Sequence, residues 1–103
     1  MSEDRAVTCN LNALTPEERN HRQILLRSLA QTIIGRSELA NGFEFRFDAA
    51  RLDLDALGEW IALERRCWPF LHFRLDLQPS GKTALALTGG QGVNEILRAE
   101  MSS

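Results

Sequence analysis

The sequence contains little cysteine, which limits the covalent and metal chemistry that the chain can carry. Its 103 residues include two cysteines, Cys9 and Cys67. Two cysteines can form at most one disulfide, and in a reducing cytosol they are expected to be thiols or ligands. They are also too few for a closed zinc site unless histidines or carboxylates complete the ligand set.

A basic excess and long apolar segments are missing as well. The formal net charge is −2 and the pI is about 5.6, and the arginines are spread along the chain. Surfaces that bind nucleic acid or anionic membranes normally gather basic residues on one face, so neither partner is expected. No apolar run approaches the roughly 20 residues that span a bilayer. Residues 1–10 are too polar for a signal peptide, and we therefore expect a cytoplasmic location.

What is present is the composition of one globular domain. Apolar residues make up 44% of the chain and charged residues 25%, which is ordinary for a globular protein. A chain of this length buries roughly 65% of the surface that its unfolded form exposes, which is enough for a single core. We expect one domain over residues 1–103, with residues 1–8 frayed.

The first predicted helix has the clearest boundaries. Thr15 can cap it, Pro16 suits the first helical position, and Glu18 completes a capping box with Thr15. Apolar residues then recur at helical spacing up to Gly35, which is typical of a residue that ends a helix. The pattern predicts a helix from Pro16 to about residue 34.

The remaining elements give the order αββαββα. Asp48 can cap a second helix and Pro69 ends it, while alternating apolar residues on either side of Asn41-Gly42 and of residues 78–82 predict two hairpins. The predicted strands cover residues 36–39, 43–47, 71–77 and 83–88, and the later helices cover 49–67 and 93–101. Both hairpins have one apolar face. The expected fold class is therefore α+β, a two-layer domain with a four-stranded, mostly antiparallel sheet and helices on one face.

One acidic residue interrupts the apolar stripe of the second helix. At about 100° per residue, Glu64 lies near the middle of the stripe that Trp60 and Trp68 share with other apolar residues, and Cys67 lies beside it. A buried carboxylate must be paired, hydrogen-bonded or protonated. Arg22, which is in line with the apolar stripe of the first helix, offers a structural ion pair. Alternatively, Glu64 is a metal ligand or a general base in a pocket lined by the two tryptophans.

Cys67 also allows more than one interpretation. It is a small core residue, a ligand, or a redox-active or nucleophilic thiol. The carboxyl end of a helix disfavours a thiolate, whereas Arg65 and Arg66 favour it. A nucleophilic cysteine usually needs a histidine within hydrogen-bonding distance. Strand alternation turns His72 outward, and His21 on the first helix is the other candidate.

Two motifs carry a family resemblance. The first is Cys-Asn-Leu followed by Leu-Thr-Pro-Glu-Glu-Arg at residues 9–19, and the second is Glu-Arg-Arg-Cys-x-Pro-Phe at residues 64–70. Shorter matches are Asn41-Gly42-Phe43, Arg46-Phe47, Phe73, Leu87-Thr88-Gly89 and Gly92-Val93. With these segments the chain resembles, over most of its length, a family of small bacterial α+β proteins that have no assigned function.

The resemblance has implications for the site. It implies that Cys9, Glu64 and Cys67 belong together as a signature, with a histidine near His21. Members commonly carry two adjacent cysteines before Pro-Phe, whereas this chain has Trp68 in the second place and so lacks a vicinal dithiol. The resemblance implies no reaction.

Three hypotheses about function follow. The first is a small binding or sensing module, with a homodimer as its candidate assembly and a pocket between the second helix and the N-terminal segment. Its candidate ligand-binding residues are Cys9, His21, Arg22, Trp60, Glu64, Cys67 and Trp68. Zinc or a soft metal is the candidate cofactor, and its candidate ligands are Cys9, His21, Glu64 and Cys67. The second hypothesis is a thiol enzyme that uses Cys67 with Glu64 or a histidine. The third is a structural interaction protein, which predicts an exposed apolar patch.

Overall fold

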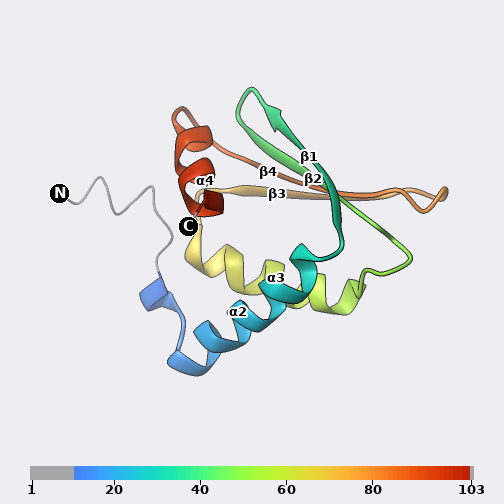
Figure 1. The fold of residues 1–103 in the computed structure, drawn as a ribbon. Coiled ribbons are helices and arrows are strands. Elements are labelled where there is room, and N and C mark those ends of the chain that lie inside the picture. Colours follow the sequence, from blue (N-terminus) through green and yellow to red (C-terminus); the bar gives the residue numbers. More distant parts are fainter. Residues whose placement is uncertain (1–10, 103) are drawn as a thin grey trace.

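The computed structural model of the chain describes residues 11–102, and Cys9 and the segment 1–8 lie outside the described residues. The elements in order are η1 (Leu11–Ala13), α2 (Pro16–Ala30), β1 (Ile33–Leu39), β2 (Gly42–Phe47), α3 (Leu54–Cys67), β3 (His72–Leu77), β4 (Thr83–Thr88) and α4 (Val93–Ser102). This arrangement confirms the predicted α+β class and its order αββαββα (Figure 1).

The four strands form one antiparallel sheet in the order β1-β2-β4-β3. Its register aligns the apolar residues of neighbouring strands on one face. Phe43 pairs with Leu87 and Phe45 with Leu85, and Leu87 pairs in turn with Phe73 on β3. Because side chains alternate along a strand, this register gives the sheet one apolar face.

The helices cover that face. Helices α2 and α3 pack against each other below the sheet, and α4 lies at the end where β4 finishes (Figure 1). The buried core joins the apolar residues of all three helices to those of β2 and β4: Leu14, Leu25, Leu29, Phe43, Phe47, Leu57, Cys67, Trp68, Leu85, Leu87, Val93 and Leu97. The β3–β4 hairpin extends beyond the helices, which leaves Leu75 and Leu77 partly exposed (Figure 1).

Helix α2 is shorter than predicted. It ends at Ala30, where the prediction had about residue 34, and the backbone N–H and hydroxyl of Thr32 both donate to the carbonyl of Leu29. The β-branched Ile33 and Ile34 instead begin β1, with an irregularity in register between Ile33 and Gly35. Gly35 is therefore a strand residue and not the end of the helix. A Cβ at this position would collide with the guanidinium of Arg46.

Helix α3 begins later than predicted. Its cap is Asp53, whose side chain accepts from the backbone N–H groups of Asp55 at 3.0 Å and Ala56 at 3.2 Å. Asp48, the predicted cap, accepts from the backbone N–H of Ala50 at 3.1 Å in the preceding turn. Both aspartates accept hydrogen bonds from backbone N–H groups, as N-cap residues do, but the helix begins after the second one. The loop between β2 and α3 is therefore longer than predicted. The predicted end was correct, because α3 stops at Cys67 before Pro69.

The smaller differences concern strand and helix ends. β3 begins at His72, one residue later than predicted, and α4 extends to Ser102. The first hairpin turns at residues 40 and 41, so Gly42 already belongs to β2 and pairs with Leu39 and Thr88. A Cβ on Gly42 would meet the carbonyl of Leu87, which explains the glycine.

Candidate functional site

Arg22 and Glu64 form an ion pair inside the protein. The Nε–H of Arg22 on α2 donates to Oε2 of Glu64 on α3, and the two residues are 8% and 4% exposed. Both belong to the apolar sides of their helices, as the sequence indicated, and the packing of α2 against α3 brings them together. Burying two charges costs several kcal/mol per ion before their attraction is counted. Apolar residues of similar size could therefore stabilise the fold as well as this ion pair does.

A cavity of about 620 Å³ lies between the helices and the sheet, with this ion pair in its wall. Most of its wall is apolar. The lining residues are Arg22, Gln23, Leu26, Leu29, Ala30, Ile33, Arg36, Phe45, Phe47, Leu57, Trp60, Glu64, Trp68, Leu71, Leu85, Leu87 and Leu97. Ligand pockets typically measure about 300–1,000 Å³ and combine an apolar wall with a few polar groups. The cavity fits this description in both respects.

The two tryptophans of α3 line the cavity next to the ion pair. Trp68 is 3% exposed, and its backbone N–H donates to the carbonyl of Glu64 at 2.7 Å, which ends the helix. Its ring packs edge to face on Phe70, with centroids 5.6 Å apart. Within the described residues, the buried indole nitrogen of Trp60 has no hydrogen-bond partner. An unsatisfied buried donor costs about 1–3 kcal/mol, and a ligand or a water molecule in the cavity could accept a hydrogen bond from this one.

The cavity has an open side and a closed side. The open side is formed by exposed residues of α2 and β1: Gln23, Leu26, Ala30, Ile33 and Arg36. Residues of the sheet and of α3 close the other side, where side chains such as Leu57 and Leu85 are 0% and 1% exposed. A molecule entering the cavity would therefore pass between α2 and β1.

A second hollow of about 470 Å³ adjoins this mouth. It is lined by Ile33, Ile34, Gly35, Arg36 and Phe45, so three residues of the main cavity wall also line this hollow. The register irregularity at the start of β1 lies among them. Bulges are often found beside binding and active sites because they redirect side chains. Arg36 was not among the candidates predicted from the sequence, since its place on the cavity wall depends on this edge of the sheet.

Cys67 lies in the core and not on the cavity wall. Its exposure is 0%, and the described lining residues do not include it. This location matches the small-core-residue interpretation. A catalytic or redox-active thiol is normally accessible.

His21 lies on the outside of the α2–α3 pair. Its side chain is 51% exposed, and its Nε2 is 3.6 Å from Oε1 of Glu59, which is 62% exposed. Among the residues searched, those the structure describes, no group of three or more histidines, cysteines and acids could hold a metal ion. The proposed metal set also includes Cys9, which lies outside the described residues. The structure thus joins Arg22, Trp60, Glu64 and Trp68 at one cavity and places His21 elsewhere.

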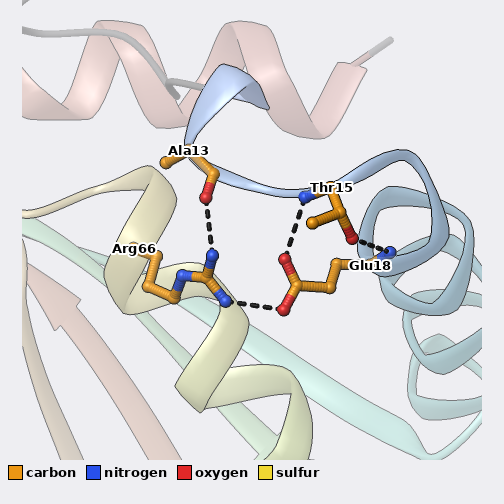
Figure 2. Close-up of polar contacts among 4 residues, drawn as sticks. All are labelled: Ala13, Thr15, Glu18 and Arg66. Carbon is orange, nitrogen blue, oxygen red and sulfur yellow. Dashed lines mark hydrogen bonds and ion pairs between the residues drawn. The ribbon is translucent and has the colours of Figure 1, made fainter.

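A polar contact connects the start of α2 to the end of α3 (Figure 2). Arg66 donates from Nη1 to Glu18 Oε2 and from Nη2 to the carbonyl of Ala13, both at 2.7 Å. The predicted capping box is present, because Thr15 and Glu18 each accept from the backbone N–H of the other, at 3.1 and 2.9 Å. The sequence predicted the capping box from local spacing but not the contact with Arg66, 48 residues away.

This contact changes the pKa values of both charged groups. The hydrogen bond from Arg66 is the main reason why the pKa of Glu18 is lowered from its ordinary value, and the backbone N–H of Thr15 adds to the effect. The same hydrogen bond raises the pKa of Arg66. The contact lies one residue before Cys67 and two before Trp68, and it holds the end of α3 that carries the cavity residues.

Comparison of the chain with protein-family models, with curated proteins and with solved structures finds no match. Within the part of the chain that the structure describes, no helix has the length and apolar character needed to cross a membrane. The structure itself defines an α+β domain with a cavity between its helices and its sheet.

Proposed function

We propose that the protein is a binding module that holds a small, mostly apolar molecule between its helices and its sheet. The observation that carries this proposal is the cavity of about 620 Å³ with a largely apolar wall. Apolar side chains that line an unfilled cavity lack the contacts that a packed core gives them, and a ligand in the cavity would supply those contacts.

The wall also carries the polar groups that a binding pocket needs. The Arg22–Glu64 pair joins two packed helices, and Arg36 lies at the mouth. A few fixed polar groups in an apolar wall orient a ligand and provide specificity. We propose a binding or sensing role, because the carboxylate that lines the cavity, that of Glu64, is already paired with Arg22.

The other two hypotheses have weaker support. The thiol enzyme requires an accessible Cys67, and this residue is fully buried. The interaction protein requires an exposed apolar patch. The exposed large apolar side chains of the described residues are distributed over α2, β1, α3 and β3: Ile24, Leu26, Ile33, Ile34, Leu54, Leu75 and Leu77. Single exposed leucines are common on protein surfaces. The cavity is the more specific feature.

Binding of a neutral apolar fluorophore tests the proposal. We expect N-phenyl-1-naphthylamine to bind saturably and to change the emission of Trp60 and Trp68, which line the cavity. Ala30→Phe places a large side chain at the mouth, and we expect it to weaken binding at least tenfold. The matched control Ala62→Phe makes the same change at an exposed position of α3 outside the cavity wall, and we expect its affinity to stay within twofold of the wild type.

A second blocking variant guards against misfolding of the first. Gln23→Phe also fills the mouth from an exposed position of α2, and circular dichroism checks that each variant folds. Absence of saturable binding to the wild type contradicts the proposal. So does equal binding to the wild type and to both folded blocking variants.

A further inference from the structure

We infer that two copies of the chain associate edge to edge through β3, as an antiparallel pair of strands that joins their sheets into one. In the register that we propose, Leu75 lies opposite Leu75 of the second copy, and Arg74 lies opposite Asp76 of the second copy. This association goes beyond the proposed binding function and does not depend on it. It follows from the position of β3 in the sheet, from its exposed apolar residues and from the order of its charges.

β3 is an edge strand of the sheet that the structure describes. The strand order is β1-β2-β4-β3, so β3 pairs with β4 on one side. The backbone N–H of Gln78 donates to the carbonyl of Lys82 at 2.9 Å, which continues the regular register of the ladder. Hydrogen-bonded and non-bonded pairs alternate along an antiparallel ladder. The backbone groups of Phe73, Leu75 and Leu77 therefore point away from β4, and an edge strand presents such groups as a template for a further strand.

The other edge of the sheet is less suited to pairing. β1 has an irregularity in register between Ile33 and Gly35, and irregularities of this kind protect edges from further strands. At the other end of β1, Asn94 of α4 donates to the carbonyl of Leu39 at 2.7 Å. β3 has a regular register over its whole length, from His72 to Leu77, and no proline. The edge of β3 is therefore the better template.

The apolar face of β3 is incompletely covered. Leu75 and Leu77 are 39% and 51% exposed, because the β3–β4 hairpin extends beyond the helices (Figure 1). In the proposed register Leu75 contacts its own copy, and Leu77 lies opposite Phe73 of the second copy. Phe73 packs against the core. Pairing thus extends the apolar face of each copy over the exposed leucines of the other.

The charges on the opposite face of β3 are complementary to themselves. Arg74 and Asp76 are both exposed. Their partners on β4 are Ala86 and Ala84, so neither charge faces an opposite charge on the adjacent strand of its own sheet. A two-fold axis at Leu75 sets each arginine opposite the aspartate of the other copy. The association therefore gives both charges a partner across the new strand pair.

Other registers lack this complementarity. With Arg74 at the two-fold axis, two guanidinium groups face each other, and with Asp76 there, two carboxylates do. Like charges directly opposite each other destabilise a strand pair, whereas opposite charges stabilise it. A shift by one residue would place the apolar residues of one copy on the polar face of the other. The axis at Leu75 is the arrangement that matches opposite charges and apolar residues together.

Charge reversal at these exposed positions tests the inference. Sedimentation equilibrium of the full chain under reducing conditions, from roughly 1 µM to 1 mM, measures the dissociation constant of the dimer. We expect the wild type to dimerise within this range, since one pair of strands makes a small interface. Arg74→Asp sets two carboxylates opposite each other, and Asp76→Arg sets two guanidinium groups opposite each other. Each variant should weaken dimerisation roughly tenfold.

Two combinations should restore association. The double variant Arg74→Asp/Asp76→Arg exchanges the charges and recovers the complementary order, so its dissociation constant should return to within about threefold of the wild type. A mixture of the two single variants should form a heterodimer more tightly than either variant pairs with itself. The matched control Arg51→Asp makes the same change of net charge at an exposed position outside the sheet and should leave dimerisation unchanged. Circular dichroism checks that every variant folds.

Three outcomes overturn the inference. The first is a wild type that stays monomeric up to the highest concentration. The second is dimerisation that neither single variant weakens, because the interface then lies elsewhere in the chain. The third is a double variant that dimerises no more tightly than the single variants, because the charges then do not face each other. Fluorophore binding by the same variants should equal that of the wild type, so a failure of the binding function is distinguishable from a failure of this inference.

Discussion

Replacement of Glu64 by glutamine should destabilise the protein strongly. The side chains of Glu64 and Arg22 are 5% and 10% exposed, so the change leaves a buried guanidinium without its counter-charge. Removal of one partner of a buried pair typically costs about 3–5 kcal/mol. A domain of this size has a total stability of about 5–15 kcal/mol. The expected fall in Tm is roughly 12–40 °C, from about 4–8 °C per kcal/mol.

Urea unfolding followed by tryptophan emission and by circular dichroism measures this change. The matched control is Glu59→Gln, the same substitution on the same helix, because Glu59 is 62% exposed and lies 3.6 Å from His21. We expect the control to change stability by less than about 0.5 kcal/mol. The double variant Arg22→Met/Glu64→Leu removes both charges and should regain most of the lost stability or exceed the wild type.

Two results would refute this reasoning. A loss below about 1 kcal/mol for Glu64→Gln would mean that the pair is not buried as the structure shows. A double variant no more stable than Glu64→Gln would mean that the unpaired charge is not the cause of the loss. Fluorophore binding by folded Glu64→Gln adds a separate readout, since unchanged binding assigns the pair a structural role.

Two further predictions concern acid stability and thiol access. The pKa of Glu18 is lowered in the folded protein from an ordinary value of 4.5, mainly by the hydrogen bond from Arg66. The contribution of Glu18 to the stability of the folded protein is therefore complete above pH 4.5, and it is lost as the pH falls through the lower folded pKa. Between about pH 5 and pH 3, the Tm of the wild type should fall more than that of Glu18→Gln, and parallel curves would contradict this. In a Cys9→Ser background, Cys67 should not react with a thiol reagent until urea unfolds the protein, because its exposure is 0%; reaction of the native protein as fast as free cysteine would support the thiol enzyme.

The sequence alone determined the features that depend on near neighbours. Capping at Thr15, the stop at Pro69 and the alternation along the strands predicted the element order and the apolar face of the sheet, because these signals act over a few residues. The charged residues Arg22 and Glu64 also stood out as interruptions of apolar stripes, and their pairing is present in the structure. When two helices pack together and each turns one charged side chain inward, few other partners are available to either charge.

Tertiary structure decided the features that depend on distances between elements. Ile33 and Ile34 fitted a helical pattern, but Ile33 pairs with Phe47 of β2, both isoleucines belong to β1, and α2 is correspondingly shorter. His21 is the neighbour of Arg22 in the sequence, yet its side chain is exposed, whereas that of Arg22 is buried. The way in which α2 packs on α3 decides which of the two side chains lies between the helices. The cavity and the place of Arg36 at its mouth depend on the spacing of two layers whose residues are far apart in the chain. Local sequence patterns contain no measure of that spacing, and only the packed fold sets it.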